Sequence, residues 1–197
     1  MESPNMQPRE VPGAPEILST TEVYRNNWMV VTESHIRRTG AGDGIYGVVH
    51  KPRAVVVVAY RPPSEAEPSG SILLVEQYRF ALKRRSWEFV AGTAPGLTTQ
   101  APTELARREL KEETGYRADC LKHVGAIEVA PGFCDQVQDV FVATDLVAGE
   151  TEREVTEEDL IARWWPVDSF RAAVGEGKIC DAQTLAAWAL VERHLGL

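Results

Sequence analysis

The sequence predicts an α+β protein in which a mixed central sheet lies between flanking helices, as an α/β/α sandwich. Strands come first, one helix follows, and further strands and helices complete the chain, without a regular strand–helix alternation. The segment AVVVVAY, residues 54–60, is an unbroken apolar run that is typical of a central strand covered on both faces. With 197 residues, the chain is long enough for one domain with a sizeable core.

The chain divides into three regions. Residues 1–16 contain four prolines and few large apolar side chains, so we expect a flexible tail. Residues 17–50 are expected to form N-terminal antiparallel strands, in which residues 23–38 and 44–52 pair around a turn in the sequence GAGDG. Residues 51–197 are expected to form the main domain and to carry the remaining elements.

Local signals predict the other elements of the main domain. Pro102 suits the first turn of a helix that begins near Ala101 or Pro102, and Gly115 is well placed to end it in the left-handed conformation. A short helix is expected after Asp168, and Asp181 is expected to cap a helix over residues 181–195. The further predicted strands span residues 71–79, 87–92, 121–130, 138–147 and 162–167.

Composition and charge restrict the compartment and the partners. The formal net charge of −8 argues against a protein that coats nucleic acid, because such proteins usually carry a basic face. The three cysteines, Cys120, Cys134 and Cys180, are odd in number and widely spaced, which fits a reducing compartment. The sequence has no signal-peptide pattern and no apolar run of membrane-spanning length. We therefore expect a cytoplasmic protein that binds neither nucleic acid nor membrane.

The octet RELKEETG, residues 108–115, places the like charges of Glu109, Glu112 and Glu113 close together on the predicted helix. At 100° per residue, these three positions fall in one sector, roughly 120° wide, with Pro102, Leu105 and Ala106. The carboxylates therefore extend the apolar stripe and are expected to point towards the body of the protein. Partly buried carboxylates must be paired, hydrogen-bonded or coordinated, and hard divalent cations prefer oxygen ligands. The alternative is a solvated acidic helix end with Arg108 tied to Glu112.

Residues 108–116, RELKEETGY, resemble the second half of the Nudix box, a motif of enzymes that hydrolyse nucleoside diphosphates linked to another moiety. The first half departs from the motif. The usual glycine is best matched by Gly92, but the stretch of fifteen residues between Gly92 and Arg108 is longer than the usual spacing. The usual glutamate within that stretch is missing, and Gln100 stands nearest to it.

About residues 20–195 resemble one subgroup of this family, the ADP-ribose pyrophosphatases. The sequences YRFALKRRSWEFVAG, APGFCDQ and GEGKICDAQTLAAWALVERHL resemble that subgroup before the box, after it and at the end of the chain. The resemblance implies a Nudix-like fold. It also implies a homodimer in which the N-terminal strands reach across to the partner.

The resemblance also implies a role for each matched residue. Glu109 and Glu113 would bind magnesium, or manganese in its place, with Glu112 as a ligand or a supporting group and the carbonyl of Ala91 completing the ligand set. Arg108 would orient a glutamate. The general base that activates water would come from the acidic sequence EVTEEDL, which names Glu157 or Glu158.

Several further side chains are candidates for substrate binding. Arg79 could clamp a phosphate or a ribose, because guanidinium groups match phosphate oxygens, and Arg85 is a weaker candidate of the same kind. Glu88 could face the metal or contact the base. Trp28 and Phe133 could stack on adenine. For the arginines an ordinary surface position, and for the aromatic residues ordinary packing, remain as alternatives.

The sequence therefore favours a metal-dependent hydrolase that cleaves ADP-ribose or a related nucleoside diphosphate sugar into a nucleoside monophosphate and a sugar phosphate. Other Nudix substrates, such as GDP-mannose, other ADP-sugars or dinucleotides, are alternatives within the family. A non-catalytic module that senses a nucleotide is an alternative from another class. An acidic protein-interaction helix is a third, and it requires the glutamates to face water.

Overall fold

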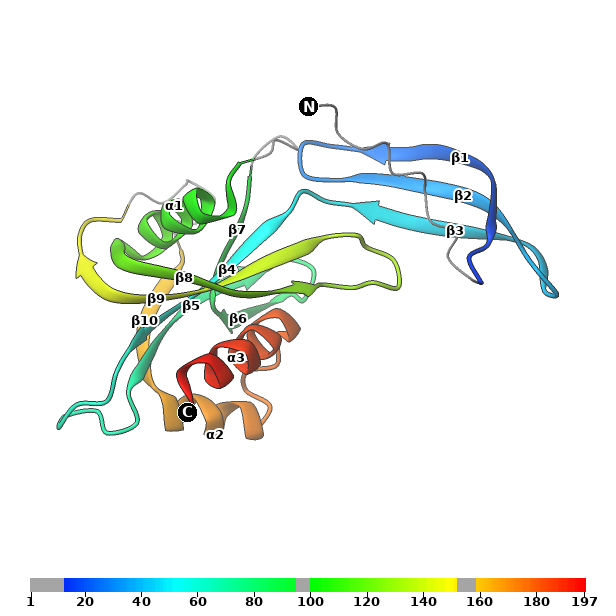
Figure 1. Cartoon of the computed structure of the whole chain (residues 1–197). Coiled ribbons are helices and arrows are strands. Elements are labelled where there is room, and N and C mark those ends of the chain that lie inside the picture. Colours follow the sequence, from blue (N-terminus) through cyan, green and yellow to red (C-terminus); the bar gives the residue numbers. More distant parts are fainter. Residues whose placement is uncertain (1–12, 95–99, 152–158) are drawn as a thin grey trace, which may run out of the picture.

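The computed structural model of the chain describes residues 13–94, 100–151 and 159–197, and they form two sheets and three helices (Figure 1). The N-terminal sheet is antiparallel, with the order β1-β2-β3. Its strands are β1 (Glu16–Arg25), β2 (Val30–Arg38) and β3 (Gly42–His50). In Figure 1 this sheet extends away from the rest of the molecule, and the main sheet with its helices forms a separate layered body.

The main sheet has the predicted mixed character, because β4 runs parallel to β9 and its other described pairings are antiparallel. The strand order is β10-β5-β4-β9-β8, with β6 paired to β5 and β7 paired to β4. The strands are β4 (Ala54–Arg61), β5 (Ser71–Arg79), β6 (Arg84–Glu88), β7 (Val90–Thr93), β8 (Tyr116–Glu128), β9 (Val137–Ala148) and β10 (Ile161–Pro166).

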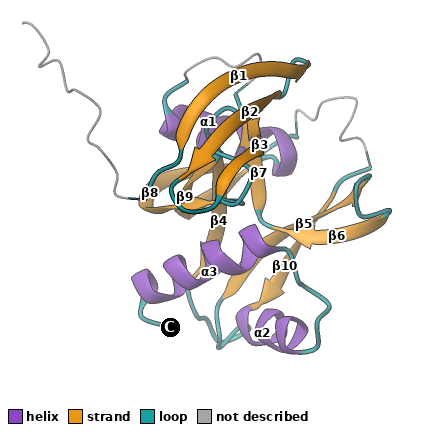
Figure 2. Cartoon of the chain, turned by 90° about the vertical axis from the view of Figure 1, so that its right-hand side faces the viewer, coloured by secondary structure: helices purple, strands orange, loops and turns teal. Residues whose placement is uncertain are grey.

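Helices cover both faces of this sheet, which confirms the predicted α/β/α sandwich (Figure 2). Val56 and Val58 of β4 point to a core with residues of α2 (Val167–Gly175) and α3 (Ala182–Leu195). Val55 and Val57 point to a second core with residues of α1 (Pro102–Thr114). Alternate residues of one strand thus face opposite cores, because the side-chain period of a strand is two.

The helix ends agree with the local signals in the sequence. Pro102 lies in the first turn of α1, and Gly115 ends this helix with φ of 75°, a left-handed conformation that favours glycine. Asp181 caps α3, because its carboxylate accepts a hydrogen bond of 2.8 Å from the backbone N–H of Thr184. None of the helices in the described ranges combines the length and the apolar character needed to cross a membrane.

The predicted strand over residues 23–38 is wrong in one respect, because a turn at residues 26–29 divides it into β1 and β2. The side-chain oxygen of Asn26 accepts hydrogen bonds from the backbone N–H groups of Trp28 and Met29, at 2.8 and 2.9 Å. An asparagine side chain can replace a backbone partner in this way and reverse the chain. The predicted pairing of β2 with β3 is confirmed.

The predicted strand over residues 87–92 is also divided, at Phe89. Glu88 pairs with β5, whereas Val90 pairs with β4, so the chain passes from one neighbouring strand to the other at this residue. The Phe89 side chain is buried, and its backbone N–H donates to the hydroxyl of Thr184 at 3.1 Å. This change of partner brings residues 90–93 beneath α1, where the functional site lies.

Candidate active site

The inward face of α1 carries the acidic residues, as the helical geometry predicts. Glu113 is 1% exposed and Glu109 is 8% exposed, whereas Glu112 is half-buried. The same face carries the buried side chains of Leu105 and Ala106, which pack into the core beneath the helix. Two carboxylates therefore lie where a surface acidic helix would place apolar side chains, and the reading of the octet as a water-facing helix does not hold for them.

Gly92 of β7 provides the space that the Glu109 carboxylate occupies. A Cβ atom at this position would lie less than 3.0 Å from the carboxyl carbon and both oxygens of Glu109, closer than real Cβ contacts come. Only glycine therefore lets the helix and the strand approach to this distance. The glycine of the motif and its glutamate are spatial neighbours, and Ala91, whose carbonyl is a predicted ligand, directly precedes Gly92.

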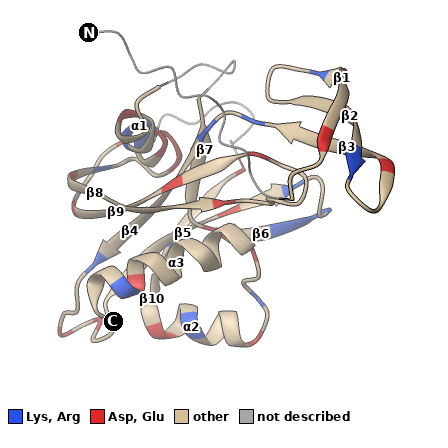
Figure 3. Ribbon diagram, turned by 45° about the vertical axis from the view of Figure 1, so that its right-hand side comes forward, with Lys and Arg blue, Asp and Glu red and all other residues tan. Residues whose placement is uncertain are grey.

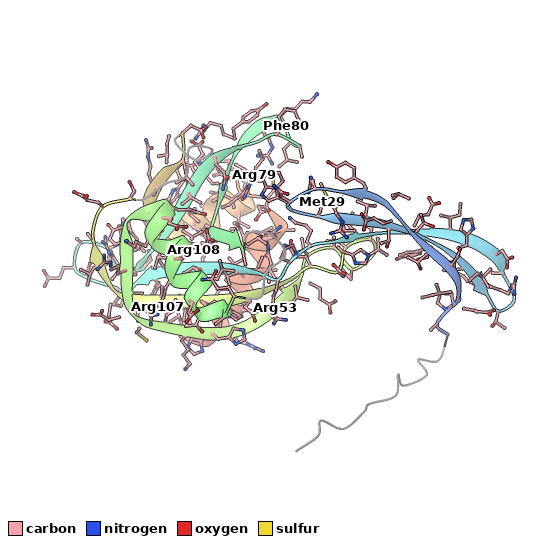
Figure 4. All side chains as sticks on the ribbon, turned by 90° about the horizontal axis from the view of Figure 1, so that it is seen from above. Met29, Arg53, Arg79, Phe80, Arg107 and Arg108 are labelled. Atoms are coloured by element: carbon pink, nitrogen blue, oxygen red, sulfur yellow. The ribbon has the colours of Figure 1, made fainter. Side chains whose placement is uncertain are left out.

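Arg108 links the acidic residues to one another. Its guanidinium lies 2.9 Å from an oxygen of Glu109 and 3.4 Å from one of Glu112, and it donates to the side-chain oxygen of Gln100 at 2.8 Å. Figure 4 shows Arg108 on α1, beside Arg107 on the same helix. Gln100, the residue nearest to the missing box glutamate, thus contributes by holding Arg108.

The donor set fits a hard divalent ion in its chemistry, because it consists of carboxylate and main-chain oxygens. Among the residues that the structure describes, no group of three or more Asp, Glu, His or Cys side chains is arranged to hold a metal ion. Arg108 instead supplies the positive charge between Glu109 and Glu112. Glu109 and Glu113 are thus buried, and Arg108 orients Glu109 and Glu112. A cation bound there would contact Glu109 together with Arg108.

A cavity of about 280 Å³ opens beside this cluster, close to the lower end of the range for small-molecule sites. It is bounded by the strand that contains Gly92, the hairpin between β5 and β6, the end of β3 and the start of α3. Its lining residues are Lys51, Arg79, Ala81, Leu82, Glu88, Ala91, Gly92, Thr93, Gln136, Gln138, Asp181 and Gln183.

Arg79 and Glu88 form an ion pair on the wall of the cavity. The guanidinium donates to both carboxylate oxygens of Glu88, with distances of 2.5 to 3.1 Å, and Glu88 is 6% exposed. Burial alone would lower the pKa of Arg79, but the hydrogen bonds to Glu88 and the negative charges of Glu88, Glu113 and Asp181 raise it overall. Arg79 is therefore a fixed positive charge surrounded by carboxylates.

Arg85 lies on the neighbouring strand β6 and does not line the cavity. It donates to Glu76 at 2.9 Å, and to the carboxylate and backbone oxygens of Asp159 at 2.6 and 2.8 Å. These contacts fasten the start of the β10 segment to the β5–β6 hairpin. Glu157 and Glu158, the predicted general bases, lie outside the described residues.

Neither of the two aromatic candidates lines this cavity. Trp28 is 67% exposed, in the turn between β1 and β2. Phe133 is 59% exposed and lines a neighbouring pocket of about 300 Å³, together with Tyr46 and Cys134. Figure 4 shows Met29, the neighbour of Trp28, at the end of the N-terminal sheet that is nearest to the body.

Sequence reasoning did not select six polar residues that line the cavity: Lys51, Thr93, Gln136, Gln138, Asp181 and Gln183. They come from the segment after β3, from β7, from β9 and the residue before it, and from the start of α3, so no local motif connects them. Only Asp181 gave a signal, as the predicted helix cap. Long-range packing brings these side chains together, so their positions in the sequence do not indicate that they line one cavity.

The comparisons with known proteins agree with this geometry. Residues 50–187 match the family model of the NUDIX domain. The chain is 30% identical to an ADP-ribose pyrophosphatase of Mycobacterium tuberculosis over 172 residues, which cover 87% of this chain and 80% of that protein. It is 36% identical to an ADP-ribose pyrophosphatase of Bacillus subtilis over 114 residues, or 58% of this chain and 57% of that protein.

A solved structure described as an ADP compounds hydrolase has the same fold, with a TM-score of 0.75 and 22% identity over 92% of this chain and 94% of that one. The family model spans most of the chain and includes α1, Gly92 and the cavity beside them. The inward glutamates and their glycine thus belong to the matched region. The chain belongs to the Nudix hydrolase family.

Proposed function

We propose that this protein hydrolyses the diphosphate bond of ADP-ribose or a related nucleoside diphosphate sugar, and that the reaction depends on a divalent metal ion. One water molecule is consumed, and the products are a nucleoside monophosphate and a sugar phosphate. Two relatives with the name ADP-ribose pyrophosphatase support this substrate class. Neutralising a diphosphate and orienting the attacking water is chemistry that bound divalent ions supply in hydrolases.

The observation that carries the proposal is the packing of Glu109 against Gly92 at the edge of a cavity that contains Arg79 and Lys51. We assign the metal ligands to Glu109, Glu113 and the Ala91 carbonyl, with Glu112 as a ligand or a supporting group. Magnesium is the expected ion because it favours a few carboxylates together with water and phosphate oxygens, and manganese is a possible replacement.

The remaining residues of the chain bind and orient the substrate. Arg79 and Lys51 would attract phosphate oxygens, and Glu88 would keep the Arg79 guanidinium in position. Arg108 would orient Glu109 and Glu112. Arg85 is assigned to the same phosphate-facing hairpin, where its contacts with Glu76 and Asp159 support an indirect role.

The general base is assigned to Glu157 or Glu158, where it would take a proton from the attacking water. Neither residue is among those that the structure describes. Asp159, the next residue in the chain, is held by Arg85. This contact supports a fixed starting point for β10 beside the proposed acidic segment.

A homodimer is proposed as the working form. The N-terminal sheet exposes large apolar side chains that one chain leaves uncovered, among them Ile17, Val23 and Trp28. A second copy covering this sheet would bring Trp28, and also Phe133, within reach of an adenine base. The cysteines are free thiols, which supports a reducing, cytoplasmic compartment.

The decisive experiment incubates the protein with a panel of ADP-ribose, other ADP-sugars, GDP-mannose and a dinucleotide, with magnesium or manganese, and measures the nucleoside monophosphate and the second phosphate product that each compound releases. Wild-type protein is expected to turn over ADP-ribose, and Glu113→Gln is expected to lose at least ~100-fold in kcat/KM. Glu104→Gln is the matched control, because Glu104 lies on the outer face of the same helix and is exposed. Its activity is expected to remain at the wild-type level.

Other results would point to the alternatives. Preferred cleavage of another compound in the panel would keep the Nudix chemistry and change the substrate. Binding of a nucleotide without release of either product would favour a sensor. Equal turnover by wild type and Glu113→Gln would remove Glu113 from the metal site.

A further inference from the structure

Three polar side chains that line the cavity lie outside the acidic motif. Gln138 comes from β9, and Asp181 and Gln183 come from the start of α3. The cavity is also lined by Lys51, Arg79 and the strand of Gly92. Lys51 and Arg79 are the only cations among the described lining residues.

Gln138 and Gln183 are joined by their side-chain amides. The Nε2 of Gln138 donates to the Oε1 of Gln183 at 2.7 Å. Gln138 is 4% exposed, and among the described residues its own Oε1 has no hydrogen-bond partner. An unmatched buried amide oxygen lowers stability, so an apolar side chain would serve the core better at this position. The reason for an amide at position 138 is therefore its hydrogen bond to Gln183, which orients the Gln183 side chain.

The hydrogen bond leaves Gln183 and Asp181 with complementary groups for a ligand. Since Gln183 Oε1 already accepts from Gln138, the Nε2 hydrogens of Gln183 are its donors for the cavity. One oxygen of Asp181 accepts from the Thr184 backbone, and this contact fixes the carboxylate while its other oxygen can accept a further bond. The negative charge of Asp181 also acts on Arg79, so the Asp181 carboxylate lies near the guanidinium that is proposed to attract phosphate oxygens.

A donor beside an acceptor matches a hydroxyl group, which donates and accepts at once, and two adjacent hydroxyls match it best. A phosphate group offers only acceptor oxygens at neutral pH, and the Asp181 carboxylate would repel it. We propose that Gln183 and Asp181 bind the hydroxyl groups of a sugar attached to the diphosphate, and that Gln138 is a positioning residue for Gln183. This inference rests on the proposed function and selects sugar-linked diphosphates within it.

The test compares two substrates that share one diphosphate. The first is ADP-ribose, and the second is ADP whose terminal phosphate carries a small alkyl ester without hydroxyl groups. Gln183→Leu is expected to lower kcat/KM about tenfold for ADP-ribose, and less than about twofold for the alkyl ester. Asp181→Asn is expected to show the same selective loss while it keeps the helix cap, because asparagine caps helices as well as aspartate.

The positioning role of Gln138 has its own measurement. Gln138→Leu is expected to lower kcat/KM for ADP-ribose in the wild-type background, and to add nothing when Gln183→Leu is already present. Gln77→Leu is the matched control, since Gln77 is a half-buried glutamine on β5 that does not line the cavity. It is expected to leave both substrates unaffected.

Two outcomes would overturn the inference, and they differ from each other. Equal losses for both substrates in Gln183→Leu would mean that the residue supports the cavity without reading hydroxyl groups, and the proposed hydrolase function would stand. Failure of the wild-type protein to cleave either compound would overturn the proposed function and, with it, this assignment.

Discussion

The central strand of the main sheet, β4, and an edge strand of the N-terminal sheet, β1, differ strongly in burial. In β4, every residue from Ala54 to Tyr60 is at most 6% exposed, with a hydrophobic core on each side. In β1, all ten residues are exposed, and Ile17 and Val23 are 66% and 56% exposed. Both strands pair with a neighbour along most of their length, although the register of β1 with β2 is irregular at two places. Backbone pairing thus accompanies both strands, and within one chain only β4 also gains from burial.

The N-terminal sheet is fastened to the body by polar contacts at one corner. The backbone N–H of Val49 donates to the carbonyl of Phe133 at 2.7 Å, and the Tyr46 hydroxyl donates to the carbonyl of Gly132 at 2.5 Å. His50 Nδ1 lies 2.6 Å from a carboxylate oxygen of Asp135. Figure 3 shows the charged residues of this sheet apart from those of the body. Within one chain, the body thus has its own buried core, whereas large apolar side chains of the N-terminal sheet stay exposed.

The largest expected effect is on kcat/KM, and it comes from comparing one glycine substitution in the body with one in the N-terminal sheet. Gly92→Ala should lower kcat/KM by at least ~100-fold, because a Cβ atom would displace the Glu109 carboxylate, and small shifts of catalytic groups cost about this much. Gly47→Ala in β3 is the control, since nothing lies within 4 Å of a Cβ atom there. Steady-state kinetics with ADP-ribose and circular dichroism of both variants provide the measurement. Equal activity of the two variants would contradict the proposed contact.

The next effect concerns stability, compared between the two sheets. Val57→Ala in β4 should lower the free energy of unfolding by roughly 2–3 kcal/mol, because Val57 is fully buried. Val23→Ala in β1 should change it by less than about 0.5 kcal/mol in a monomer, where the side chain is exposed. Urea unfolding at several protein concentrations measures both.

This pair of variants also examines the proposed dimer. A second copy covers β1 if Val23→Ala lowers the free energy of unfolding as much as Val57→Ala at high protein concentration and does not change it at low protein concentration. Sedimentation of Val23→Asp should then show a shift towards the monomer. A concentration-independent result with monomeric wild-type protein would reject the proposed homodimer.

The smallest effect compares an ion pair whose carboxylate is buried with an ion pair in which both partners are exposed. Asp139 is 3% exposed and contacts Arg53 and His123, and the hydrogen bond from Arg53 keeps the pKa of Asp139 below its ordinary value. Asp139→Asn should lower the free energy of unfolding by about 1–2 kcal/mol near neutral pH. Asp43→Asn, which breaks the exposed pair with Arg37, should have almost no effect.

The pH dependence follows from the sign of that shift. Because the folded protein lowers the pKa of Asp139, the stabilisation is present above the unfolded pKa near 4 and is lost as the pH falls through the lower folded value. The difference in unfolding free energy between wild type and Asp139→Asn should therefore shrink progressively as the pH falls below about 5. A constant difference over this range, measured by chemical denaturation, would contradict the assignment.

Local chemistry in the sequence predicted the elements whose signals are short-range. Gly115 and Asp181 marked the ends of α1 and α3 through their conformational preference and their capping oxygen. The apolar run in β4 and the acidic stripe of α1 indicated which side chains face inward. Each of these signals depends on a few neighbouring residues, so it can be read without knowing where the chain goes next.

The breaks in the strands were beyond such reasoning for a different reason in each case. At residues 26–29 a side-chain oxygen of Asn26 takes over backbone bonding, and this competes with an alternating pattern that suits a longer strand. At Phe89 the chain changes its partner from β5 to β4, a choice that depends on strands distant in the sequence.

The sequence by itself determined the sandwich, the acidic face of α1 and the family motif, because helical periodicity and strand hydrophobicity are properties of short segments. Only the tertiary structure decided that Arg79 is held by Glu88, that Arg85 is held by Glu76 and Asp159, and that Gln138, Asp181 and Gln183 share one cavity. Those arrangements depend on which distant segments pack together, and packing is settled by burial over the whole chain.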